Sequence, residues 1–207
     1  MIEIIYFLGM RLEFWTLIMA GVAIFFVALK DFIIPLILKP NLEISYSPKE
    51  PYKRFPIMIS PGSNFGAFDR FKVNNVGKEI AKNCRCQIYS IKDKDGKSID
   101  LQGFPLMWAS RPDSAENFIQ AERLNIGPGE SEFVDLVHMR HHDTTQIFFS
   151  SYHNIPIGMA NSIPIGENII EIIVSGDNFK PYIVSFKIFE KLELNGFKIK
   201  LLKIERK

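Results

Sequence analysis

The chain has 207 residues and a formal net charge of +2, with 25 lysine and arginine residues against 23 aspartate and glutamate residues. This length accommodates about one domain of ordinary size and an accessory segment. The near balance of charge excludes the basic footprint typical of nucleic-acid-binding proteins, so no nucleic acid is expected as a partner.

The most apolar segment lies near the N-terminus. No charged residue occurs in Phe14–Leu29, and after Lys30 and Asp31 the apolar sequence resumes up to residue 38. A helix needs about 20 apolar residues to cross a hydrocarbon core of about 30 Å. The sequence therefore predicts a transmembrane helix from Phe14 to about Ile34, with Lys30 and Asp31 reaching an interface. Residues 14–38 are expected to contact the lipid bilayer.

Two prolines end the predicted helix. Pro35 and Pro40 cannot donate the next intrahelical hydrogen bond, so residues 1–40 are predicted to form an N-terminal membrane anchor. A cleaved signal peptide is the alternative. Against it, the residues before the apolar run are not predominantly basic, the run is too long, and no small-x-small cleavage site follows it.

The residues that flank the anchor predict its orientation. Basic flanking residues tend to remain in the cytoplasm, and more of them follow the helix than precede it. Cys84 and Cys86 are poorly spaced for a disulfide with each other and fit a reducing compartment. We therefore expect a single-pass protein of the cell membrane with a cytoplasmic C-terminal domain. The basic residues that follow the start of the helix are Lys30, Lys39, Lys49, Lys53 and Arg54.

The rest of the chain, residues 41–207, has the pattern of a β domain. Residues 42–45 alternate in polarity, and a proline-rich loop follows them. Residues 67–77 predict a strand. Its two faces carry Phe68, Arg70, Lys72 and Asn74 on one side and Asp69, Phe71 and Val73 on the other.

Residues 84–101 predict a hairpin. The even-numbered residues from Cys84 to Ser90 share one face, Ile91 lies on the other, and Asp95-Gly96 is a favoured tight turn. The same pattern recurs later in the chain, with predicted strands on either side of the turns at Gly127-Pro128-Gly129 and Gly176-Asp177-Asn178. Short strands at a spacing of about ten residues, without a convincing soluble amphipathic helix, predict a mostly β protein with a β-sandwich.

The C-terminal segment, residues 191–207, predicts a further hairpin that extends the sandwich. Asn195-Gly196 is a strong two-residue turn signal. A turn at this position would pair Leu194 with Phe197 and Leu192 with Ile199, which places four apolar side chains on one surface. The alternative is that the basic residues of this segment hold the chain against anionic lipid, and the two possibilities can coexist.

Three stretches of the β region resemble prokaryotic immunoglobulin-like modules of the CARDB type. The sequence FKVNNVGKEIAKNCRCQI, residues 71–88, is similar to the strand-turn-strand of these modules. LNIGPGESEFVDL and NIIEIIVSGDN are similar to two of their later strand segments. Residues 100–122 and 140–165 depart from the pattern. The resemblance implies an immunoglobulin-like β-sandwich with an adhesion, scaffolding or partner-binding role, and it brings no catalytic residues with it.

All four histidines of the chain lie between residues 137 and 153. In a continuous strand His138 and His142 would be about 13 Å apart, too far to share one metal ion. A turn could bring His138, His141, His142, Asp143 and His153 together, and imidazole and carboxylate groups suit zinc. The alternative is a polar loop with histidines at its rim. The spacing also lacks the helical H-x-x-x-H pattern that preorganises metal ligands.

The other candidate sites are weaker. Cys84 and Cys86 could ligate a soft metal, but closely spaced strand cysteines are more often small core residues. The sequence Asp93-Lys94-Asp95-Gly96 resembles the start of a calcium loop, but its glycine falls too early, so a turn is predicted.

A possible contact for a partner lies in the first inserted stretch. Phe104, Met107 and Trp108 could form an exposed aromatic contact there. The alternative is that these side chains cover the sandwich core as a lid.

Together these patterns predict a membrane-anchored β-sandwich that acts as a binding, scaffolding or complex-assembly module. It is expected to have a protein partner, no cofactor and no enzymatic activity. The alternative is a metal-binding protein or a metal-dependent enzyme that uses the histidine loop, residues 138–153.

Overall fold

A computed structural model describes residues 6–7, 10–34, 38–54, 65–110, 122–140, 143–150, 161–191 and 197–207. The chain forms two compact units, Met1–Lys39 and Pro40–Lys207.

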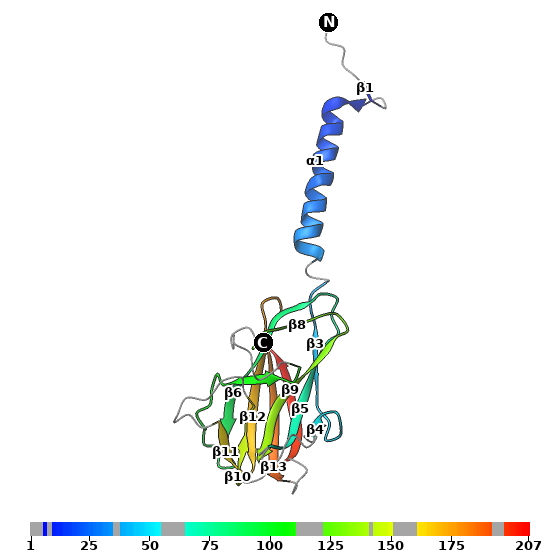
Figure 1. Ribbon diagram of the computed structural model, residues 1–207. Coiled ribbons are helices and arrows are strands. Elements are labelled where there is room, and N and C mark those ends of the chain that lie inside the picture. Colours follow the sequence, from blue (N-terminus) through cyan, green and yellow to red (C-terminus); the bar gives the residue numbers. More distant parts are fainter. Residues whose placement is uncertain are drawn as a thin grey trace. The chain divides into compact units, whose positions relative to one another are not determined.

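The first unit contains one long apolar helix. A short antiparallel pair, β1 (Tyr6–Phe7) and β2 (Met10–Arg11), precedes α1 (Leu12–Ala28), which continues as the π-helical turn η1 (Leu29–Ile33) (Figure 1). The window Phe14–Asp31 is long and apolar enough to cross a membrane, and none of it is buried.

The apolar side chains of α1 are not confined to one face. The consecutive residues Ile24, Phe25, Phe26 and Val27 are all exposed. Because successive residues of an α-helix are rotated by about 100°, these four side chains point to every side of the helix. A helix that is apolar on all sides fits a bilayer or the interior of a large protein rather than a protein surface in water.

The second unit is built from strands β3 to β14, which form one continuous antiparallel sheet. The strands are β3 (Leu42–Ser45), β4 (Lys53–Arg54), β5 (Phe65–Asn75), β6 (Ala81–Lys92), β7 (Pro105–Trp108), β8 (Leu124–Ile126), β9 (Ser131–Arg140), β10 (Asp143–Phe148), β11 (Ser162–Pro164), β12 (Asn168–Ser175), β13 (Tyr182–Lys191) and β14 (Phe197–Arg206).

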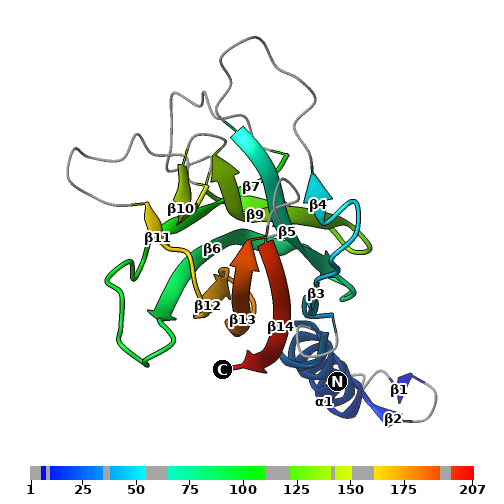
Figure 2. The same cartoon turned by 90° about the horizontal axis from the view of Figure 1, so that it is seen from below.

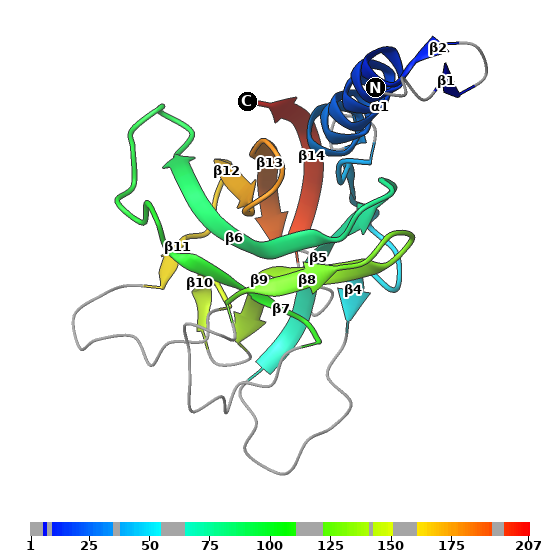
Figure 3. The ribbon, with the colours of Figure 1, turned by 90° about the horizontal axis from the view of Figure 1, so that it is seen from above.

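The sheet folds over itself into two layers. The first layer has the order β11-β10-β9-β5, with β3 and β4 on the other side of β5, and the second has the order β6-β12-β13-β14. β7 joins the layers, because it pairs with both β9 and β6. Figures 2 and 3 show the two layers from opposite ends. The expected fold class, a mostly β sandwich preceded by one apolar helix, is confirmed.

Both layers contribute side chains to one hydrophobic core. In β12 the residues Asn168, Ile170, Ile172 and Val174 are buried, and the residues between them are not. This period of two is the pattern of a strand with one face on the core. The largest fully buried side chains are Trp108, Phe71, Phe149, Phe186, Phe197, Ile88, Ile91, Leu106, Ile126 and Leu136.

A β-bulge in β6 changes the predicted faces of this strand. Glu171 of β12 pairs with Ser90, but the next residue, Ile172, pairs with Ile88, so that Tyr89 is an extra residue. The bulge reverses the alternation beyond this point. The assignment of Ile91 to the face opposite Ile88 was therefore wrong, and both side chains lie in the core.

The C-terminal strand forms a hairpin with β13, but the predicted register was wrong. Phe197 pairs with Lys191 and Ile199 pairs with Ile188, in place of the expected leucine partners. The predicted turn at Asn195-Gly196 lies outside the described residues. Burial explains the observed register, because it places Ile188, Phe197 and Ile199 together in the core.

Candidate functional site

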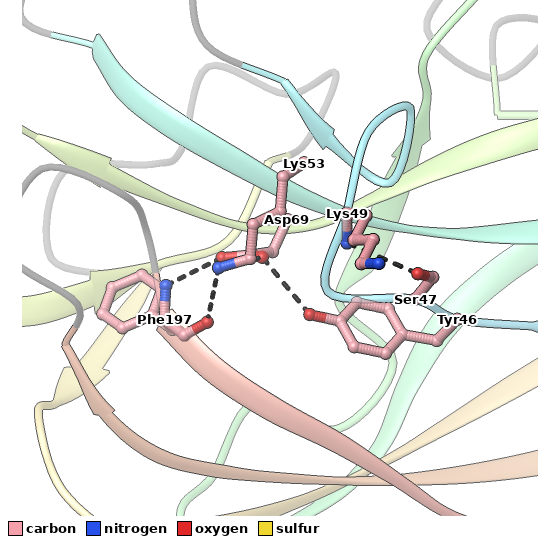
Figure 4. Close-up of polar contacts among 6 residues, drawn as sticks. All are labelled: Tyr46, Ser47, Lys49, Lys53, Asp69 and Phe197. Atoms are coloured by element: carbon pink, nitrogen blue, oxygen red, sulfur yellow. Dashed lines mark hydrogen bonds and ion pairs between the residues drawn. The ribbon is translucent and has the colours of Figure 1, made fainter.

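Four residues from separate parts of the β domain meet in a buried polar cluster, which we call the edge clip. It consists of Asp69 in β5, Lys53 in β4, Tyr46 just after β3, and the main chain of Phe197 at the start of β14 (Figure 4). The clip joins β14, at the end of the second layer, to the margin of the first layer.

In the edge clip, two side chains bind the main chain at the start of β14. The Phe197 amide donates to Asp69 Oδ2 at 2.9 Å, and the Phe197 carbonyl accepts from Lys53 Nζ at 2.8 Å. Lys53 Nζ also lies 3.3 Å from Asp69 Oδ1, and the Tyr46 hydroxyl donates to the same oxygen at 3.4 Å. One carboxylate and one ammonium group thus satisfy both main-chain groups of Phe197, as a neighbouring strand would.

Pairing of β4 with β5 positions the two charged groups. Lys53 and Asp69 are direct cross-strand partners, and Tyr46 follows the end of β3, which pairs with β5 further along. The side chains of Asp69 and Lys53 are almost completely buried. Main-chain groups at the edge of a sheet need such partners when water cannot reach them.

Burial dominates the electrostatics of the edge clip. Burial raises the pKa of Asp69 above its ordinary value, although Lys53, the Phe197 amide and the Tyr46 hydroxyl each lower it. The pKa of Tyr46 is also raised, by burial first and then by the negative charge of Asp69. A buried ion pair of this kind holds parts of the fold in a defined register, while its desolvation offsets much of its Coulomb energy.

Sequence reasoning missed the edge clip, although one signal was present. Asp69 alternates with Phe71 and Val73 and so falls on the apolar face of its strand. A carboxylate on a core-facing position predicts a buried partner. Its partners could not be identified in this way, because Phe197 lies 128 residues away in the chain.

A second buried ion pair lies in the first layer. Arg70 Nε is 2.5 Å from Asp135 Oδ1, and the two residues are cross-strand partners in β5 and β9. Arg70 follows Asp69, so its side chain points to the opposite face of the strand. The guanidinium group also lies 6.0 Å from the centroid of the Phe68 ring.

His138, the first of the predicted metal ligands, is a buried residue of the central strand β9. Its ring lies between Phe68 of β5 and Phe148 of β10, with ring centroids 5.3 Å and 5.7 Å away. His138 Nδ1 is 3.0 Å from Ser150 Oγ. This environment gives the imidazole a packing role between two aromatic side chains.

The rest of the predicted metal site cannot be assembled from the described residues. His141, His142 and His153 lie outside them, and Asp143 is described only by its main chain, which pairs with Arg140. Among the residues that the structure describes, no group of three or more histidine, cysteine or acidic side chains could hold a metal ion. The metal site remains a prediction.

The two cysteines are buried core residues with free thiols. Burial raises the pKa of Cys84 to about 12 and that of Cys86 well above its ordinary value. Thiolates are the reactive species, so neither thiol is expected to be reactive in the folded domain.

Both cysteines should therefore remain unmodified by a maleimide at pH 8 while the domain is folded and should react within minutes in guanidinium chloride. Rapid modification of the folded protein, followed by mass spectrometry, would contradict this placement.

The acidic stretch Asp93–Gly96 forms a turn in which a side chain binds the main chain. Asp93 Oδ1 accepts hydrogen bonds from the amides of Asp95 at 3.0 Å and Lys97 at 2.8 Å. Gly96 has a φ of 77°, which glycine adopts without strain. The Asp93 carboxylate therefore stabilises the turn that the sequence predicted.

The predicted aromatic contact lies against or within the core. Trp108 is fully buried, and its indole Nε1 donates to the Glu122 carbonyl at 3.1 Å. Phe104 and Met107 are partly buried and pack against the same core. Trp108 thus takes the covering position given by the alternative interpretation, whereas a partner contact through Phe104 and Met107 remains a prediction.

Comparison of the chain with protein-family models, with curated proteins and with solved structures finds no match. The resemblance to CARDB-type modules therefore remains an interpretation of the three sequence stretches that carry it.

Proposed function

We propose that the protein is a single-pass membrane protein whose helix anchors a β-sandwich domain that binds a protein partner and assists the assembly of a complex. The observation that carries this proposal is the division of the chain into an apolar helix and a separate compact β unit. A domain with its own core needs no second domain to fold, so it can present its surface to a partner while the helix holds it in place.

The buried polar groups bind to one another and to the main chain within the fold, which supports a structural rather than a catalytic role for them. Each buried polar or charged residue of the described part of the β domain has a partner within the fold. Asn168, for example, donates to the carbonyls of Pro164 and Gly166. The others are Lys53, Asp69, Arg70, Asn75, Asp135, His138 and Ser150.

The partner can be tested by quantitative affinity purification from native membranes. The full chain is compared with a chain of residues 1–40, which keeps the anchor and lacks the β domain. We expect proteins that co-purify in constant proportion with the full chain and are absent from the control. Recovery of the same proteins with both chains, or of the full chain alone, would contradict a binding role of the β domain.

We further propose that the β domain lies in the cytoplasm, because basic residues are more numerous after the helix than before it. An Asp95→Cys variant places a thiol in an exposed turn, while the native cysteines stay buried. A membrane-impermeant maleimide should fail to modify this variant in intact cells and should modify it after lysis. Modification in intact cells would place the domain outside.

A further inference from the structure

Strand β14 forms a long free edge of the described sheet. It ends the row of strands in the second layer, and among the described strands only β13 pairs with it. The other described strands that pair on one side only are short: β8 and β11 have three residues each, β3 has four and β4 has two. β14 has ten residues and no proline. An edge of this length offers main-chain groups to another strand.

Hydrogen bonds at the start of β14 show which main-chain groups point away from β13. The amide and carbonyl of Phe197 bind Asp69 and Lys53 of the edge clip (Figure 4). Main-chain groups on one side of a strand recur at every second residue, so those of Ile199 and Leu201 point to the same side as those of Phe197. The edge clip therefore occupies the first position of this edge, and β13 does not use the positions that follow it.

The free edge continues beyond a β-bulge in β14. Lys207 N donates to Pro181 O, next to β13, so the main-chain groups of Ile204 and Arg206 point away from β13. The register with β13 skips Leu202, and this extra residue changes the alternation. The residues whose main-chain groups point outwards after Phe197 are Ile199, Leu201, Ile204 and Arg206.

The strands of the second layer are basic, whereas those of the first layer are neutral. β6, β12, β13 and β14 together contain nine basic residues, three in β6, two in β13 and four in β14, against three acidic residues. The strands β3, β4, β5, β9, β10 and β11 contain five of each. These numbers include acidic residues that accept hydrogen bonds, such as Glu171 from Ser90, because such a bond leaves the charge in place. The charged residues of β14 are Lys198, Lys200, Lys203, Glu205 and Arg206.

The side chains of β14 give the two faces of the free edge different characters. Lys200 is exposed, while Ile199 and Leu201 on either side of it pack in or against the core. Beyond the bulge, Ile204 pairs with the core residue Val184 but is 40% exposed. Cross-strand neighbours prefer apolar partners for apolar residues and opposite charges for charged ones. A matching strand would therefore alternate apolar and acidic residues, and a second copy of β14, which is itself basic, would be repelled.

We infer, on the basis of the proposed binding function, that the free edge of β14 binds an extended segment of the protein partner in which apolar and acidic residues alternate. The segment adds a strand to the second layer. Its main chain pairs with the outward groups of β14, its apolar side chains cover Ile204 and extend the core, and its acidic side chains lie beside Lys200 and Lys203.

The test uses the purified full chain in micelles of a neutral detergent and synthetic peptides of about ten residues, the length of β14. In the first peptide valine alternates with glutamate, and in the second valine alternates with lysine. The third has the composition of the first, with its valines and glutamates in separate blocks. We expect the first peptide to bind, and the other two to bind more weakly by on the order of 10-fold or more.

Each control peptide removes one part of the recognition. If the lysine peptide binds as tightly as the glutamate peptide, charge does not select the segment. If the block peptide binds as tightly, the alternation of a paired strand is not recognised. Either result, or no binding of the first peptide, would overturn the inference.

Charge variants of the chain test the same contact from the other side. Lys200→Gln with Lys203→Gln should weaken binding of the glutamate peptide on the order of 10-fold. The domain should stay folded, because Lys203 is exposed and surface ion pairs add little to stability. The matched control, Lys92→Gln with Lys94→Gln, removes the same charge at the end of β6 and should bind as the unchanged chain does. Equal binding by both variants would contradict a contact at β14.

Amide hydrogen exchange, followed by nuclear magnetic resonance, locates the bound peptide. In the free protein the amides of Leu201 and Ile204, which point away from β13, should exchange faster than those of Lys200 and Glu205, which point towards it. The glutamate peptide should slow the exchange of Leu201 and Ile204. Binding without this protection would place the peptide elsewhere and overturn the inference.

Purification of the natural partner from native membranes separates the use of β14 from the binding function itself. If a partner co-purifies equally with the unchanged chain and with the Lys200→Gln, Lys203→Gln chain, the binding function stands and the use of β14 is wrong. If no protein co-purifies through the β domain, the binding function is contradicted, and the assignment of its surface with it.

Discussion

A chain that ends at Lys191, without β14, is expected to lose cooperative folding of the β domain. The truncation removes Phe197 and Ile199 from the core, and burial of each such side chain contributes about 1.5–3 kcal/mol. It also leaves Asp69 and Lys53 without the main chain that they bind. Together these losses approach the total stability of an ordinary domain, about 5–15 kcal/mol.

Thermal unfolding of residues 40–207, followed by the fluorescence of the buried Trp108, provides the measurement. The complete fragment should give one sharp transition, and the truncated fragment should give none. A control that ends at Glu205 keeps Phe197 and Ile199 and should retain the transition. If the fragment ending at Lys191 melts like the complete one, β14 is not part of the core.

Substitution of Asp69 by alanine is expected to have the second largest effect, a loss of about 3–5 kcal/mol, because it leaves the ammonium group of Lys53 buried without its carboxylate. It also removes the acceptor of the Phe197 amide. The Lys53→Met variant should be less damaging. Since burial already raises the pKa of Asp69, this carboxyl group can accept a proton when its cation is removed.

The pH dependence distinguishes the two substitutions. Lys53 lowers the pKa of Asp69, so in Lys53→Met the folded-state pKa of Asp69 exceeds its unfolded value by more than it does in the unchanged fragment, and the folded variant gains more from binding the proton. The resulting stability is fully present below the unfolded pKa, about 4, and is lost as the pH rises through the folded pKa. The deficit of Lys53→Met relative to the unchanged fragment should therefore shrink between pH 7 and pH 4, whereas that of Asp69→Ala should not shrink in this way.

Urea unfolding at several pH values measures both variants. The exposed pair of Lys203 and Glu205 supplies the control, because surface ion pairs add little to stability, and Glu205→Ala should leave the transition midpoint unchanged. If Asp69→Ala is as stable as the unchanged fragment, the edge clip does not hold the layers together.

Local patterns in the sequence were sufficient to predict most strands. The predicted strand at residues 42–45 has the bounds of β3, and the Gly127–Gly129 turn separates β8 from β9 as expected. Alternation of apolar residues and glycine-containing turns carries this information, because both act over a few residues.

Features that depend on distant parts of the chain could not be predicted in this way. The bulge at Tyr89 is defined by pairing with β12, more than 80 residues later, and nothing in the alternation around Tyr89 marks it. At the C-terminus a strong local turn signal competed with the burial of Phe197 and Ile199 against Ile188, and burial determined the observed register. The edge clip likewise brings Lys53 to Phe197 across 144 residues.

The candidate site was predicted less well than the fold. The type and spacing of the histidines suggested a metal site. In the structure, His138 packs between two phenylalanine rings. Trp108 was a candidate contact because aromatic residues in an insertion can be exposed, but β7 carries it into the core. In both cases the residue type suggested a function, whereas the burial of the side chain depends on the whole fold and could not be read from the local sequence; the metal site and the partner contact themselves remain predictions.

Alkaline carbonate extraction tests the central claim, that an N-terminal helix anchors the β domain in the membrane, most directly. Membranes containing the full chain are washed at high pH, and the intact mass of the recovered protein is determined. The same extraction is applied to residues 40–207. We expect the full chain in the membrane pellet with the helix still attached and the fragment in the supernatant. Release of the full chain, or a recovered mass that lacks the helix, would contradict the anchor.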